Sequence, residues 1–225
     1  MGNAIGQMLA FAVGVAVSPF AIVAAVLILI TPRAKANGLT FLLGWMLGIA
    51  VLGAIALAVI GPSNPTSQGA PATWVDWLKL VLGVLLLVVG IKEWRSRPAP
   101  DAEVPMPKWM GALDGITPVR ASGLGVLIGA VNPKNFLFII GGAAAVAQTG
   151  VSGADQTVAW VVFTVIASLG VIVPVGIYFA MGERADEALQ RLKGSMVRNN
   201  TAIMAVLCLI IAAKLIGDAI SGFSS

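Results

Sequence analysis

The chain has 225 residues, of which 58% are hydrophobic and only 11% are charged, and its formal net charge is +4. An average soluble domain is about 25% charged, and a soluble globule of this size could not bury so much apolar surface. The composition therefore excludes a soluble enzyme and a disordered chain and indicates an integral membrane protein. With no histidine and one cysteine, the chain also lacks the means for a histidine-based metal site, a CxxC pair or an internal disulfide.

Six apolar stretches follow one another along the sequence, and each is long enough to cross a bilayer as a helix, which takes about 20 residues. The alternating pattern of a transmembrane barrel strand is absent, so these stretches predict helices. The expected fold is an all-α integral membrane protein with six transmembrane helices. The predicted spans are residues 4–30, 39–61, 75–94, 121–148, 156–181 and 200–220.

Positive charges between the spans predict the orientation of the helices. Eleven of the fourteen Lys and Arg residues fall in the first, third and fifth connections, whereas the second and fourth connections contain none. Because basic connections stay in the cytoplasm, both termini are expected to lie outside. The excess of positive charge is then explained by an anionic leaflet rather than by nucleic acid.

A proline-rich linker divides the six spans into two groups of three. We place a first three-helix repeat at residues 1–97, a cytoplasmic linker at 98–119 and a second repeat at 120–225. Since three is an odd number, the two repeats would have opposite orientations in the membrane. This is the geometry of an inverted-topology repeat, which is common among secondary transporters.

The connection between the fifth and sixth spans carries an amphipathic pattern. Within residues 183–198, one helical face collects Ala185, Leu189, Leu192 and Met196. The pattern favours a short amphipathic helix that lies on the cytoplasmic membrane surface. An ordinary solvated connector is the alternative.

The first span of each half contains a polar residue followed by proline near its middle. Ser18 precedes Pro19 in the first half, and Asn132 precedes Pro133 in the second. Proline lacks an N–H and clashes with the carbonyl four residues earlier, so each helix is expected to break there. Freed carbonyls need partners in hydrocarbon, so two matched breaks predict a central cavity, with tolerated kinks as the alternative. Pro174 in the fifth span predicts a further kink that could act as a hinge.

Lys134 lies about halfway along the fourth span, directly after the second break. A lysine at a helix centre costs about 2.5–3.5 kcal/mol, so its side chain is expected to face a wet cavity. No Asp or Glu is predicted deep inside a span, so we expect a ligand anion to neutralise Lys134, with Asn132, Asn135 and Ser18 donating hydrogen bonds. The alternative is a structural lysine that binds carbonyls of the broken helix.

Several motifs, taken in order, resemble one family of membrane proteins. The likeness covers essentially the whole chain, and the ordered set resembles the GAP family, which comprises the Sap-like, peptidoglycolipid-addressing proteins of the lysine exporter (LysE) superfamily. The motifs are Ser18-Pro19, Thr31-Pro32-Arg33, Phe41-Leu42-Leu43-Gly44-Trp45-Met46-Leu47-Gly48, Lys108-Trp109-Met110, Leu124-Gly125, Asn132-Pro133-Lys134-Asn135 and Arg198-Asn199-Asn200-Thr201-Ala202-Ile203-Met204.

This resemblance implies two inverted three-helix halves in the bacterial plasma membrane and export of a cell-envelope glycolipid such as a sulfolipid. We therefore expect an exporter or flippase for an amphiphilic, anionic envelope lipid or glycolipid that works by alternating access. Proton-coupled efflux of a small amino acid or metabolite and a non-transporting scaffold for an export complex are the alternatives. The residues that match the family's paired helix-break motifs are Ser18, Pro19, Asn132, Pro133, Lys134 and Asn135.

The expected partners are membrane lipids and the anionic lipid or glycolipid substrate, and nucleic acid is not among them. A homodimer and contacts with envelope-lipid biosynthesis or export proteins stay open. We expect neither catalysis nor a cofactor or metal, because the sequence contains no recognisable nucleophile–base pair and no set of metal ligands.

Overall fold

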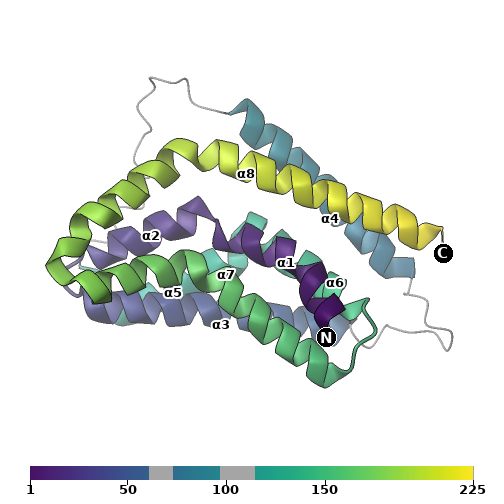
Figure 1. The fold of residues 1–225 in the computed structure, drawn as a ribbon, viewed down its shortest axis with the longest axis horizontal. Helices are drawn as coiled ribbons and strands as arrows, with labels where there is room; N and C mark the ends of the chain where they lie inside the picture. Colours follow the sequence, from purple (N-terminus) through teal and green to yellow (C-terminus); the bar gives the residue numbers. More distant parts are fainter. Residues whose placement is uncertain (61–72, 97–114, 225) are drawn as a thin grey trace.

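The computed structural model describes residues 1–60, 73–96 and 115–224, and every regular element in these ranges is helical (Figure 1). The all-helical prediction is thereby confirmed for the described part of the chain. The elements are α1 (Gly2–Ala16), α2 (Pro19–Leu29), α3 (Ala34–Ile60), α4 (Thr73–Arg95), α5 (Pro118–Val126), a π-helical turn (Leu127–Val131), α6 (Pro133–Ala147), α7 (Gly153–Met181), a 3₁₀ turn (Gly182–Arg184) and α8 (Ala185–Phe223).

Four described helices are long and apolar enough to cross a membrane singly: α3, α4, α7 and the Thr201–Phe223 part of α8. Two further candidates are bent pairs, α1–α2 with a bend of 50° and α5–α6 with a bend of 61°. Together they correspond to the six predicted spans when each bent pair counts as one. Large apolar side chains are exposed at every fourth position of α3, as expected for a face that contacts lipid: Leu43, Leu47, Val51, Ile55 and Val59. The chain is thus a multi-pass membrane protein.

Helix α2 is almost wholly buried among other helices. It contacts α3, α7 and α8, and ten of its eleven residues are buried (Figure 1). Its sequence is apolar on every side, which suits a helix surrounded by other helices or by lipid. Around it, α4 packs along α8, α3 packs along α5, and α1 packs against both α6 and α7.

Glycines allow the close approach of α3 and α5. A Cβ atom at Gly44 would overlap the backbone of Ser122, and one at Gly125 would overlap the backbone of Phe41. Only a residue without a side chain fits at either position, so Gly44 and Gly125 let two helices of the same chain pack closely. The pairing places the π-helical turn and the second break against α3.

One predicted element differs in the structure. Residues 183–198 do not contain a separate amphipathic helix, because α8 runs without interruption through 39 residues from Ala185. Ala185 and Leu189 are fully buried, while Leu192 and Met196 pack partly buried against the core, so this apolar face contacts protein rather than the membrane surface. The same face continues into the span, and no proline interrupts it; its later buried members are Met204, Cys208, Ile211 and Leu215.

The N-terminus and the C-terminal end of α8 lie at the same end of the molecule (Figure 1). This end also holds the first turn of α4 and the junction between α6 and α7. The predicted linker, residues 98–119, and the repeat boundary before it fall mostly outside the described residues, so the proposed division into repeats stays a prediction.

Candidate functional site

The first break separates α1 from α2 at the predicted position. Ser18 has an extended backbone (φ −65°, ψ 106°), and Pro19 is the first residue of α2. The Ser18 carbonyl accepts hydrogen bonds from the N–H groups of Ala21 and Ile22, which starts the new helix. The Ser18 side chain is buried, yet its hydroxyl caps none of the N–H groups of α2.

The second break also follows the prediction and has its own cap. Asn132 turns away from the helix (φ −57°, ψ 122°), and Pro133 is the first residue of α6. The Asn132 Oδ1 atom accepts a hydrogen bond from the backbone N–H of Lys134 at 3.1 Å. An asparagine cap followed by proline is a favourable start for a helix, so the local sequence explains where α6 begins.

Asn135 closes the gap that the second break leaves in the backbone. The Asn132 N–H donates to the carbonyl of Leu127, and Pro133 has no N–H, so the Ile128 carbonyl loses its helical partners. The Nδ2 atom of Asn135 donates to that carbonyl at 2.9 Å. Asn135 is fully buried, and its Oδ1 atom has no partner among the described residues. Its amide therefore supports the fold, which differs from the expected role as a hydrogen-bond donor to a ligand.

Lys134 has a protein counter-ion, contrary to prediction. Its Nζ atom lies 2.6 Å from Oε1 of Glu93 in α4, and the two side chains are 22% and 21% exposed. The expectation of an unpaired lysine is wrong because Glu93, near the end of the third predicted span, lies beside the start of α6. In the structure α6 runs antiparallel to α4, so the first turn of α6 meets the last turn of α4.

Pro174, where the sequence predicts a kink, lies inside one helix. Helix α7 is continuous from Gly153 to Met181, with Pro174 buried inside it. Helices α1, α2 and α3 pack along α7. Pro174 is therefore an interior residue of one helix, and the kink and hinge expected there stay a prediction.

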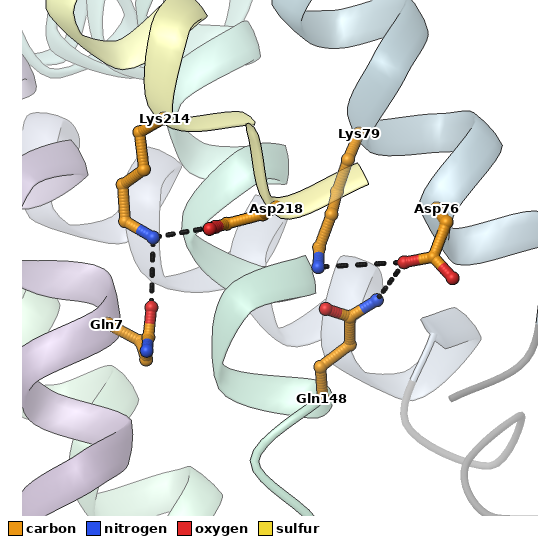
Figure 2. Close-up of polar contacts among 6 residues, drawn as sticks. All are labelled: Gln7, Asp76, Lys79, Gln148, Lys214 and Asp218. Atoms are coloured by element: carbon orange, nitrogen blue, oxygen red, sulfur yellow. Dashed lines mark hydrogen bonds and ion pairs between the residues drawn. The ribbon is translucent and has the colours of Figure 1, made fainter. Parts of the chain in front are cut away.

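A second polar site brings together side chains from four parts of the chain, at the end of the molecule that carries both termini (Figure 2). We call it the terminal polar cluster. Figure 2 shows its six side chains directed toward one another. They are Gln7 of α1, Asp76 and Lys79 of α4, Gln148 after α6, and Lys214 and Asp218 of α8.

Two ion pairs organise the terminal polar cluster. Lys214 Nζ lies 2.7 Å from Asp218 Oδ2 and donates a second hydrogen bond to Gln7 Oε1 at 2.9 Å. Asp76 Oδ1 accepts a hydrogen bond from Gln148 Nε2 at 3.1 Å and lies 3.7 Å from Lys79 Nζ. The Asp76 and Lys79 side chains are 2% and 7% exposed, so two charges are buried here beside a polar amide.

A hollow of about 310 Å³ lies beside this cluster. Three charged residues line it, two of them acidic, and the Lys214 ammonium is not part of the lining. Amide and hydroxyl groups supply most of the remaining polar surface. The polar lining residues are Asn3, Gln7, Asp76, Lys79, Gln148, Thr149, Asp218 and Ser221.

Nothing in the sequence alone places these six side chains together. The sequence does place two charged pairs within the spans of a chain that has few charges. Asp76 and Lys79 are three residues apart, and Lys214 and Asp218 are four residues apart. The second pair could be interpreted as a snorkelling interfacial pair. The structure adds the packing of α4 against α8, of α4 against α6 and of α8 against α1, which turns two local pairs into one site.

Comparison with known proteins identifies a family. The model of the family described as Sap, sulfolipid-1-addressing protein, matches residues 8–221, a range that includes both helix breaks and leaves out residues 1–7 and 222–224 of the described structure. No curated protein and no solved structure gave a significant match to the chain. The chain therefore belongs to the Sap, sulfolipid-1-addressing protein family, a membership that suggests a role in lipid addressing or export.

Proposed function

We propose that the protein is an exporter or flippase that moves an amphiphilic envelope lipid or glycolipid with an anionic headgroup across the bacterial plasma membrane by alternating access. The observation that carries this proposal is the pair of broken spans at Ser18 and Asn132. Interrupted helices are tolerated in a membrane where they are enclosed by protein or line a wet pathway, and transporters place their binding sites at such breaks. Family membership supplies the lipid class.

The packing of the helices supports two inverted halves. Contacts of one half recur in the other when α1–α2, α3 and α4 are exchanged for α5–α6, α7 and α8: α3 packs on α5 as α7 packs on α1, and α2 packs on α8 as α6 packs on α4. Two inverted halves would allow alternating access, since the same motion then opens one side or the other. Kinship with the GAP family and the LysE superfamily is part of this proposal.

Lys134 enters the proposed mechanism as one member of an ion pair. Glu93 compensates its charge at 2.6 Å, and about a fifth of each side chain is exposed. An anionic headgroup that reaches Lys134 would compete with Glu93 for the same ammonium group, and the exchange keeps the lysine paired throughout. Release of Glu93 would loosen the contact of α4 with α6 and so couple lipid binding to movement of the broken span.

The remaining groups at the breaks have narrower roles in this proposal. The Ser18 hydroxyl and the Asn132 amide nitrogen would hydrogen-bond the headgroup, since the Asn132 oxygen already caps α6. Pro19 and Pro133 would keep the two breaks open by preventing a continuous helix. Asn135 would hold the second break in shape.

The test is a leaflet-exchange assay with purified protein in liposomes that contain a fluorescently labelled sulfated glycolipid. We expect protein-dependent movement of the label between leaflets, measured by dithionite reduction of the outer label. Lys134→Met should slow it about tenfold or more, as a loss of ~1.4 kcal/mol of binding would. Lys92→Met, which removes a neighbouring exposed charge outside the ion pair, is the matched control and should leave the rate unchanged.

Other results would favour the alternatives. Accumulation of a labelled amino acid in the liposome lumen, without movement of the lipid label, would replace this proposal with efflux of a small metabolite. Co-purification with a lipid synthase or a larger transporter, with no movement of either probe, would favour a scaffold.

A further inference from the structure

The terminal polar cluster has the properties of a binding site separate from the helix breaks. Asp76 and Lys79 are both more than nine-tenths buried, although burying charges within a membrane span is costly. A charged pair repays that cost best at hydrogen-bond distance, about 2.7–2.9 Å, whereas Lys79 Nζ stands 3.7 Å from Asp76. The Lys79 side chain instead lines the hollow beside the cluster.

The charges around the hollow argue against a simple ion as its ligand. Asp76 and Asp218 contribute two carboxylates and Lys79 contributes one ammonium, while the Lys214 ammonium is already bound by Asp218 and Gln7. Because Lys214 neutralises Asp218 and Lys79 stands near Asp76, the charges of the cluster balance, and the hollow has no net positive charge that would attract an anion. A small cation would meet the Lys79 ammonium, so it is disfavoured as well.

Neutral groups that both donate and accept hydrogen bonds match this lining. Carboxylate oxygens and amide oxygens accept from hydroxyl groups, and the ammonium and amide N–H groups donate to them. Gln148 shows this dual capacity, because its Nε2 atom binds Asp76 and its Oε1 atom remains an acceptor. The volume of about 310 Å³ lies at the lower end of the range of small-molecule sites, about 300–1,000 Å³.

We infer that the hollow beside the terminal polar cluster binds the polyhydroxylated, carbohydrate part of a lipid headgroup. This inference rests on the proposed function, and it assigns a second site to the same substrate. The two sites lie at opposite ends of α6, where Lys134 meets Glu93 and Gln148 meets Asp76, both on α4. The site near Lys134 attracts the anionic group of the headgroup, whereas the hollow attracts its hydroxyl groups. A headgroup bound in the hollow would therefore no longer contact Lys134.

Binding can be measured on the full chain in phosphatidylcholine nanodiscs with sucrose as the probe. Saturation-transfer difference NMR should detect sucrose binding to the wild type, and sodium sulfate should not compete with it.

Gln148→Leu and the milder Asn3→Ala each remove a polar group from the lining, and we expect the apparent Kd to rise about fivefold, as the loss of one hydrogen bond of ~1 kcal/mol would give. Asn3 is exposed, so the second variant does not threaten folding. Asn199→Ala, an exposed asparagine of α8 outside the hollow, is the matched control and should bind as the wild type does.

The outcomes separate this site from the proposed function. Competition by sulfate, absence of sucrose binding to the wild type, or unchanged Kd values in both variants would overturn the inference. Suppression of the sucrose signal by a glycosyl diacylglycerol in the same nanodiscs is expected for a lipid headgroup, whereas a site for free sugar would keep the signal. Sucrose binding by a protein that moves no lipid would support this site and contradict the transport proposal. Lipid transport without sucrose binding would support the transport proposal and overturn this site.

Discussion

Glu93→Gln tests the ion pair between Glu93 and Lys134. The substitution keeps the shape of the side chain but removes the charge that lies 2.6 Å from Lys134 Nζ. Exposed ion pairs contribute about 0–1 kcal/mol, whereas removal of one partner from a buried pair costs about 3–5 kcal/mol. Since about four-fifths of each side chain is covered, we expect Glu93→Gln or Lys134→Met to lower the free energy of unfolding by about 2 kcal/mol.

A double-mutant cycle isolates the interaction. Lys134→Met combined with Glu93→Gln leaves no unpaired charge, so the double variant should lose less than the two single variants together, with a coupling energy of about 1–2 kcal/mol. Unfolding in detergent micelles, followed by tryptophan fluorescence, gives the four free energies. Glu187→Gln provides the matched control, because its partner Arg191 and Glu187 itself are 78% exposed and their pair should contribute little. Additive single effects, within about 0.3–0.5 kcal/mol, would refute this reasoning.

Three further changes test the packing and the second break, each by thermal unfolding in nanodiscs. Gly125→Ala forces a methyl group into the backbone of α3 and should cost about 1–3 kcal/mol, while Gly123→Ala on the same helix meets open space and should be neutral or slightly stabilising; equal effects would contradict the close approach. Asn135→Leu leaves the Ile128 carbonyl unpaired in the core and should cost about 1–3 kcal/mol, which an unchanged transition temperature would rule out. Asn132→Ala removes the cap of α6 and should cost about 1 kcal/mol, and a stabilised variant would disprove the role of the cap.

The parts of the structure that the sequence predicts are those set by local chemistry. A proline fixes its own backbone and removes its own hydrogen bond, so the breaks at Pro19 and Pro133 could be placed to the residue. At Pro174 the same rule predicts a kink but not whether the helix ends, and the structure shows that α7 continues through this residue while α1, α2 and α3 pack along it.

The candidate sites depend on helix packing that no local pattern encodes. Glu93 is 41 positions from Lys134 in the sequence, and only the antiparallel contact of α4 with α6 brings them together. Likewise Gln7 and Lys214 come from opposite ends of the chain. Residues 183–198 show the same limit, because an apolar face indicates burial but not whether lipid or protein covers it.

The rate of lipid exchange between leaflets, compared between the wild type and the variant Pro19→Ala with Pro133→Ala, tests the role of the broken spans most directly. The account predicts that the wild type speeds movement of a labelled sulfated glycolipid well above the rate in protein-free vesicles, and that the double variant, with both helices able to straighten, falls close to that background. A wild type that moves no lipid, or a double variant that moves it at the wild-type rate, would contradict the account.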